Sequence, residues 1–178
     1  MQKLYLERNG IGILGGSFDP PHKGHLYISK VAIKKLRLNK IIWVVTKKNP
    51  LKQKPHLSLS KRIKLSKKKI KNEKKIYVQY LDNKIKSNNT FDLLNYIKKK
   101  NPKKTIYFLI GSDNLINFHK WFNWHKIPKL AKIIVFPRQN YTMRSLNFIV
   151  KKKLKKNDLI YIKSKKINIS SSLIRKLW

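Results

Sequence analysis

The residues with the clearest chemical potential lie between Gly15 and His25, in the stretch GGSFDPPHKGH. It follows an apolar run, Ile11–Leu14, and precedes a helix-like segment, Leu26–Leu36. At a helix entry the backbone N–H groups are unpaired and carry partial positive charge, which favours an anion. The two glycines let a ligand approach the backbone, and His22 and His25 add imidazole N–H donors. This order of residues predicts a phosphate site.

Two other interpretations of this stretch are weaker. Gly10–Gly15 satisfies the dinucleotide pattern G-x-G-x-x-G, but its glycines lie within or before the expected strand. That pattern requires glycines after a strand, at the opening of a helix, so we expect no dinucleotide site of this type. His22 and His25 could also ligate a metal, but they are too few, and Asp19 is the only nearby carboxylate. We predict phosphate binding and no protein-held metal.

A second candidate site lies near the C-terminus, in the segment Ile169–Arg175 (ISSSLIR). Ser170 alone would be explained as a helix cap. Three hydroxyls at a helix N-terminus, with Arg175 one turn later, can also bind an anion. The first motif supports this interpretation, because it too places groups that can bind an anion at the start of a helix.

Composition limits the class of protein. The chain has 178 residues, which suits one domain over 1–178 with a real core. It has no cysteine, so disulfides, thiolate metal sites and cysteine nucleophiles are excluded. The first nine residues have no apolar signal region, and the apolar runs are too short to span a bilayer. We expect a soluble cytoplasmic protein that is not attached to a membrane.

The charge is extreme, with 44 basic and 7 acidic residues and a net charge of +37. Such a charge can indicate nucleic-acid binding. Here the basic residues are mostly lysine and run from end to end, which favours a coding bias over a dedicated binding surface. We expect no specific nucleic-acid partner, although the field would accelerate the encounter with small anionic substrates.

Short apolar segments alternate with amphipathic ones along the chain. The expected strands are Ile11–Leu14, Ile41–Thr46, Ile76–Leu81, Thr105–Ile110, Ile133–Phe136 and Leu159–Lys163. The expected helices are Leu26–Leu36, a segment capped by Ser60 that runs to about Lys71, a segment capped by Thr90 that ends before Pro102, one that follows the Gly111–Asp113 turn, Ile127–Ala131, Met143–Lys156 and Ser170–Leu177.

This alternation predicts an α/β fold with a parallel sheet of five to six strands flanked by helices. In such sheets ligands bind outside the carboxyl ends of the strands, near the switch in strand order. The turns Gly15–His25 and Gly111–Asp113 and the loop after Thr46 would all lie on that edge.

At this point the motifs identify a family. GGSFDPPHKGH and ISSSLIR resemble the two end motifs of the nucleotidylyltransferase superfamily. More narrowly, the chain is similar to bacterial nicotinate-nucleotide adenylyltransferases. That resemblance rests further on four internal segments, which occur in the right order: Asn49–Lys52, Phe108–Leu115, Phe118–Trp121 and Phe136–Arg138.

The resemblance implies a Rossmann-like fold and adenylyl transfer from ATP to nicotinate mononucleotide, which gives deamido-NAD and pyrophosphate in NAD biosynthesis. The acceptor phosphate is already an anionic nucleophile, so the in-line displacement needs no general base. Catalysis would come from positioning and from neutralising charge. Mg²⁺ would be carried mainly by the ATP phosphates and would need few protein ligands.

The resemblance also assigns residues. Implied as catalytic are His22, His25 and Arg175, with His25 stabilising transition-state charge. Implied as ATP-binding are Gly15, Gly16, Ser17, Phe18, His22, His25, Gly111, Asp113, Ile169, Ser170 and Arg175. Implied as binding nicotinate mononucleotide are Ser17, Lys52, Thr90, Trp121, Phe122 and Arg138, with Trp121 stacked on the pyridine ring.

Some features leave alternatives open. The family often has a tyrosine and a second threonine around Thr90, and this chain has neither there. Pantetheine-phosphate adenylyltransferases share both end motifs, but Gly16-Ser17-Phe18 and Trp121 favour the pyridine-nucleotide branch. A basic nucleic-acid-binding protein on an inactive transferase fold is a further alternative, against which the intact histidines argue. The chain could be a monomer or a homodimer.

Overall fold

A computed structural model describes residues 9–138, 148–155, 157–164 and 169–176. Its centre is a six-stranded sheet in the order β3-β2-β1-β4-β5-β6, and every neighbouring pair is parallel. The strands are β1 (Ile11–Gly16), β2 (Lys40–Val45), β3 (Ile76–Gln79), β4 (Ile106–Gly111), β5 (Lys132–Phe136) and β6 (Leu159–Tyr161). The predicted parallel sheet is confirmed.

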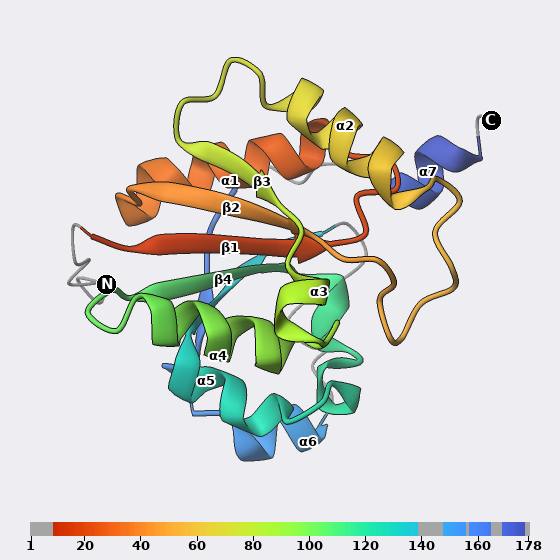
Figure 1. The fold of residues 1–178 in the computed structure, drawn as a ribbon. Coiled ribbons are helices and arrows are strands. Elements are labelled where there is room, and N and C mark those ends of the chain that lie inside the picture. The colour runs from red at the N-terminus through yellow and green to blue at the C-terminus, as the bar shows by residue number, and fades with distance from the viewer. Residues whose placement is uncertain (1–8, 139–147, 156, 165–168, 177–178) are drawn as a thin grey trace.

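The central strands are continuous apolar runs because both faces of the sheet are covered. On one face, α1 (Lys23–Leu36) and α2 (Leu59–Lys69) pack against the sheet (Figure 1). On the other lie α3 (Asp82–Ile85), α4 (Thr90–Lys100), α5 (Ile127–Leu130) and α6 (Phe148–Lys153). Two apolar clusters result, one on each side of the sheet.

The strand order reverses between β1 and β4. From β1 the chain moves outward to β2 and β3, and from β4 it moves the other way to β5 and β6. The carboxyl ends of β1 and β4 therefore open the crevice in which α/β sheets bind ligands. The last described helix, α7 (Ser171–Arg175), lies at that same edge, beside the turn that leaves β1 (Figure 1).

Several predicted boundaries are wrong. Ser58, not Ser60, caps α2, and its hydroxyl accepts the Lys61 N–H, because the helix already begins at Leu59. Thr90 is the first residue of α4 and not its cap. The turn after β4 forms short 3₁₀ helices at Ser112–Leu115, Phe118–Lys120 and Trp124–Lys126 in place of a regular helix.

Other differences concern lengths. β3 ends at Gln79 and β6 at Tyr161, each two residues before the predicted end, and α3 was not predicted. Only the part Phe148–Lys153 of the predicted Met143–Lys156 helix is observed, and residues 143–147 and 156 lie outside the described residues.

No helix within the described ranges combines the length and apolar character that crossing a bilayer requires.

Candidate active site

A cleft of about 1250 Å³ opens at the carboxyl edge of the sheet. Every residue that the sequence singled out as a site residue lines it. From the first motif and the C-terminal segment these are Gly15, Gly16, Ser17, Phe18, His22, His25, Ile169, Ser170 and Arg175, and from the rest of the chain Lys52, Thr90, Gly111, Asp113, Trp121, Phe122 and Arg138. The fold therefore gathers them, while the contact that each makes with a substrate stays a prediction.

The two histidines are held by the first turn of α1. His22 is the N-cap, and its Nδ1 accepts the N–H of Gly24 at 3.1 Å. The N–H of His22 in turn donates to Nδ1 of His25 at 3.2 Å. The ring centroids lie 3.8 Å apart. Because a neutral imidazole has one acceptor and one donor nitrogen, each ring presents its proton on Nε2.

The pKa of each imidazole is lowered, so both rings are neutral near pH 7. Burial, with the charges of Arg138 and Lys69, lowers the pKa of His22 to about 4. Burial also lowers the pKa of His25 well below its ordinary value, and His22, Arg138 and Lys52 add to that effect. Near pH 7 each neutral imidazole can donate a hydrogen bond from Nε2 to a ligand but does not readily take up a proton, which suits an anionic ligand that is already deprotonated.

His25 packs against two aromatic side chains, Phe18 and Trp43. Phe18 is 2% exposed and lies 5.0 Å from Trp43 and 4.7 Å from His25 between ring centroids. Trp43 Nε1 donates to Ser29 Oγ, and that hydroxyl donates to the His25 carbonyl, each at 2.8 Å. Phe18 has a left-handed backbone, with φ of 49°, which costs about 1–2 kcal/mol. Burial of its ring offsets that strain.

Gly24 lies where no side chain fits easily. A Cβ there would come within 2.9 Å of the His22 ring and 3.1 Å of Ile169 Cγ2. Real Cβ atoms essentially never approach a neighbour as closely as the first distance. The glycine between the histidines therefore leaves room for the His22 ring on one side and for Ile169 of the C-terminal segment on the other.

The C-terminal helix α7 lies beside the turn that leaves β1, and both line the cleft. Ser170 caps α7 by accepting the Leu173 N–H, as predicted, and Ser171 Oγ donates to the Pro20 carbonyl at 2.9 Å. Arg175 Nη1 donates to the Asp19 carbonyl at 2.6 Å and lies 3.6 Å from Asp19 Oδ2. Arg175 thus ties α7 to the turn after β1, its Nη2 also donates to Ser172 Oγ at 3.2 Å, and the residue lines the cleft.

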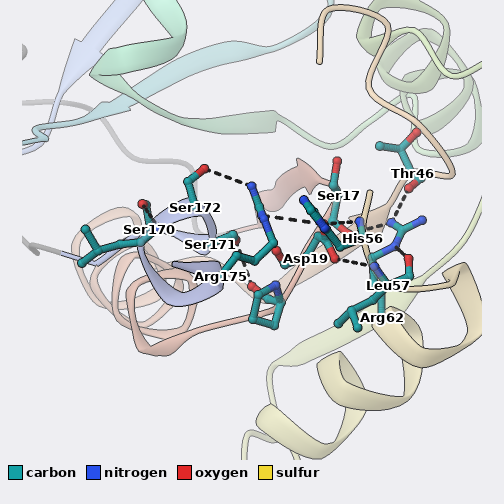
Figure 2. A network of polar contacts seen from close by, with 12 residues as sticks. Ser17, Asp19, Thr46, His56, Leu57, Arg62, Ser170, Ser171, Ser172 and Arg175 are labelled. Atoms are coloured by element: carbon teal, nitrogen blue, oxygen red, sulfur yellow. Dashed lines mark hydrogen bonds and ion pairs between the residues drawn. The ribbon is translucent and has the colours of Figure 1, made fainter. Parts of the chain in front are cut away.

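Two residues near this turn were missed by sequence reasoning (Figure 2). Asp19 was considered only as a metal ligand, but its carboxylate accepts the N–H groups of His56 and Leu57 at 2.8 and 3.0 Å. Arg62 is buried, and its guanidinium reaches main-chain carbonyls of three segments. As the single arginine in the lysine-rich helix α2, it could have been noticed in the sequence.

The far side of the cleft is built after β4 and β5. Arg138 Nε lies 3.4 Å from Asp113 Oδ1, and the Arg138 N–H donates to Ser112 Oγ. Trp121 is half-buried against Phe118, with ring centroids 5.1 Å apart. This side therefore offers one ion pair and an aromatic surface.

Near Trp121, Phe122 is 54% exposed and meets Phe91 edge to face. Thr90 begins the neighbouring helix α4. This part of the cleft suits a flat, partly apolar ring.

The carboxylates that line the cleft in the described part of the chain are all engaged. Asp19 accepts two backbone N–H groups and pairs with Arg175. Asp82 accepts Thr46 Oγ1 and the Lys47 N–H, and Asp113 pairs with Arg138. None of these carboxylates is therefore free to act as a general base. The arrangement instead favours a reaction driven by positioning and by donors to anionic oxygens.

Comparisons with known proteins agree with this geometry. A sequence model of the family described as cytidylyltransferase-like matches residues 13–177. A relative from Pelagibacter ubique (strain HTCC1062), named "Probable nicotinate-nucleotide adenylyltransferase", is 49% identical over 98% of this chain and 96% of its own length. A relative of the same name from Ruegeria sp. (strain TM1040) is 37% identical over 72% of this chain and 67% of its own.

A solved structure is similar as well. Plasmodium falciparum nicotinic acid mononucleotide adenylyltransferase complexed with NaAD superposes with a TM-score of 0.75. The match covers 96% of this chain and 83% of that one, at 26% identity. The similarity therefore extends over nearly the whole chain.

Proposed function

The chain belongs to the cytidylyltransferase-like family, and from that premise we propose that it transfers the adenylyl group of ATP to nicotinate mononucleotide. The products are deamido-NAD and pyrophosphate, in a step of NAD biosynthesis. It is an enzyme, a nicotinate-nucleotide adenylyltransferase by its relatives and its structural neighbour.

The observation that carries this function is the state of the titratable groups in the cleft. Two neutral imidazoles offer Nε2 protons, and the carboxylates among the described lining residues are already paired. The phosphate of a mononucleotide is an anion at neutral pH and attacks without losing a proton. Such a nucleophile needs the donors present here and no base.

The two walls of the cleft suggest how the substrates divide it. We assign the ATP phosphates to the turn Gly15–Phe18, with His22 and His25 donating to oxygens on which charge develops. Arg175 would add a donor from the α7 side. The pyridine ring would stack on Trp121, with its carboxylate near the backbone of Thr90 and Phe122.

The remaining assignments follow the same division. Gly111 and Asp113 would hold the adenosine ribose, and Ile169 and Ser170 would hold adenine. Lys52 lies in the loop between β2 and α2 and would reach a phosphate. Arg138 would meet the mononucleotide once its pairing with Asp113 loosens.

Mg²⁺ fits this site as a companion of the phosphates. Within the described ranges no group of three or more His, Asp or Glu side chains could hold a metal ion. Asp19, the carboxylate nearest the phosphate turn in sequence, is taken up by two N–H groups and Arg175. Bound to phosphate oxygens, Mg²⁺ would neutralise part of their charge and keep most of its water. The protein would then hold it through the nucleotide.

We further propose a single domain over 1–178, since one sheet with a core on each face spans the described residues. We also propose a cytoplasmic location, where both nucleotide substrates would be supplied. The high positive charge would raise the rate at which these anions meet the cleft.

A panel of acceptors tests the function. The protein is mixed with ATP and Mg²⁺ and, in turn, with nicotinate mononucleotide, nicotinamide mononucleotide, phosphopantetheine or no acceptor, and pyrophosphate release is measured. We expect the fastest release with nicotinate mononucleotide and none above background without an acceptor. Release with phosphopantetheine alone would favour the other branch of the superfamily and contradict the proposal.

A further inference from the structure

Arg62 makes an unusual set of contacts behind the phosphate turn. Its Nη1 donates to the carbonyls of Ser17 and Thr46, both at 2.7 Å. Nε donates to the Leu57 carbonyl at 3.1 Å and Nη2 to the Lys47 carbonyl at 3.0 Å (Figure 2). The residue is 2% exposed, so nearly all of its donors serve the protein itself. Three segments, after β1, after β2 and before α2, therefore meet at one guanidinium.

The contact with Ser17 has a directional consequence. In a planar trans peptide the C=O and the following N–H point in opposite directions. The Ser17 carbonyl points at Arg62, which is absent from the described residues that line the cleft, whereas Ser17 and Phe18 belong to that lining. The Phe18 N–H therefore points away from Arg62, and Phe18 itself lines the cleft.

We propose that Arg62 is a positioning residue for adenylyl transfer, which holds the Ser17–Phe18 peptide so that the Phe18 N–H aims at a nucleotide phosphate. This inference rests on the proposed function, because it assigns that phosphate to ATP. Phe18 needs such support: its left-handed backbone, with φ of 49°, is uncommon for a bulky residue. The hydrogen bond from Arg62 to the Ser17 carbonyl holds the peptide that precedes Phe18, and stacking on Trp43 holds the Phe18 ring.

The choice of arginine in this chain supports the proposal. Only six of its 44 basic residues are arginine. A guanidinium is a planar fork with five donors and can bond carbonyls that lie in different directions, whereas an ammonium group is a compact point charge. Lysine could not keep all four bonds. Burial lowers the pKa of Arg62, and Asp19 and Asp82 oppose that shift, so the group stays charged behind the turn.

The variant Arg62→Lys tests the proposal, with Arg37→Lys as the matched control. Arg37 is exposed at the far end of α1 and lies outside the cleft lining. We measure kcat per folded molecule, with the folded fraction taken from circular dichroism, and KM for each substrate. For Arg62→Lys we expect kcat to fall about 10- to 100-fold with a higher KM for ATP. KM for nicotinate mononucleotide should change less than about twofold, since its pyridine ring is assigned to Trp121 and not to the Ser17–Phe18 peptide.

A purely structural role gives a different result. It would lower the melting temperature and the folded fraction but leave kcat per folded molecule within about twofold of wild type, and that outcome would overturn the proposal. Wild-type turnover is measured first, so a failure of the proposed function is seen before any variant is compared.

A second measurement needs no variant and no turnover. In the ¹⁵N-labelled wild-type protein, a non-hydrolysable ATP analogue should shift the Phe18 amide resonance and slow its exchange with solvent. An unchanged Phe18 amide in a protein saturated with the analogue would contradict the proposal, even if Arg62→Lys failed to fold. The same shift without catalytic turnover would retain the positioning of a phosphate while rejecting adenylyl transfer.

Discussion

The backbone N–H of His22 donates to Nδ1 of His25 at 3.2 Å, so the cap of α1 fixes the protonation of the histidine pair. His22 Nδ1 is occupied in the same way by the Gly24 N–H. Each ring is left with a proton on Nε2 and no free acceptor. Because the helix start occupies both Nδ1 atoms, the histidine pair can donate hydrogen bonds to an anion but cannot easily take up a proton.

The first prediction concerns stability against pH. The pKa of His22 is lowered to about 4 in the folded protein, and that of His25 is also lowered, whereas both titrate near 6.5 when unfolded. Between these values the unfolded chain binds more protons, so the free energy of unfolding falls as pH drops from about 6.5 towards 4. Above that window the contribution is complete. We expect a loss on the order of 3 kcal/mol from His22 in urea titrations.

The control for this prediction is His22→Asn. Asparagine can accept the Gly24 N–H as a helix cap but does not titrate. It should lose less stability between pH 6.5 and pH 4 than wild type, while the seven acidic residues contribute equally to both proteins. Equal losses would show that His22 does not carry the effect.

The second prediction separates stability from activity at Gly24. Alanine favours a helix over glycine by about 1 kcal/mol, so Gly24→Ala should not lower the melting temperature through helix propensity. Its Cβ would press on the His22 ring at 2.9 Å and displace it. We expect kcat to fall about tenfold, as for a misplaced donor. Lys30→Ala, later in α1, is the control, because Lys30 pairs with Glu73 and lies outside the described cleft lining. Unchanged kcat in Gly24→Ala would count against a role for the His22 orientation.

The third prediction assigns the acceptor ring to Trp121. Trp121→Ala should raise KM for nicotinate mononucleotide about tenfold by loss of stacking, and KM for ATP should change little. Trp124→Ala is the matched control, because Trp124 also packs on Phe118 but is not in the described cleft lining. An equal rise of both KM values in Trp121→Ala would show a general loss of packing and not a subsite.

Local patterns in the sequence predicted the parallel sheet and the glycine–histidine turn at its carboxyl edge. The runs at Ile41–Val45 and Ile106–Ile110 are apolar throughout because helices cover both faces of the sheet. Such continuous runs can be recognised from the sequence alone. The glycine turn and the histidine pair are adjacent in sequence, so their geometry follows from one helix cap. The resemblance then added the distant residues, such as Trp121 and Arg138.

The contacts between distant segments could not be read from the sequence. The bond from Arg62 to Ser17 joins residues 45 apart, and that from Arg175 to Asp19 joins residues 156 apart. Both use backbone carbonyls as acceptors, which every residue possesses and which leave no pattern of side chains. The cap of α2 was misplaced for a local reason, since Ser58 and Ser60 are both suitable and only the structure selects Ser58.

The measurement that tests the account most directly is the kcat of His25→Ala for pyrophosphate release from ATP and nicotinate mononucleotide. His125→Ala is the control, because that imidazole is exposed and lies outside the described cleft lining. If His25 donates to charge that develops in the transition state, its loss lowers kcat about 100-fold or more in a folded protein, and His125→Ala behaves as wild type. A folded His25→Ala with a kcat within about twofold of wild type would contradict the account.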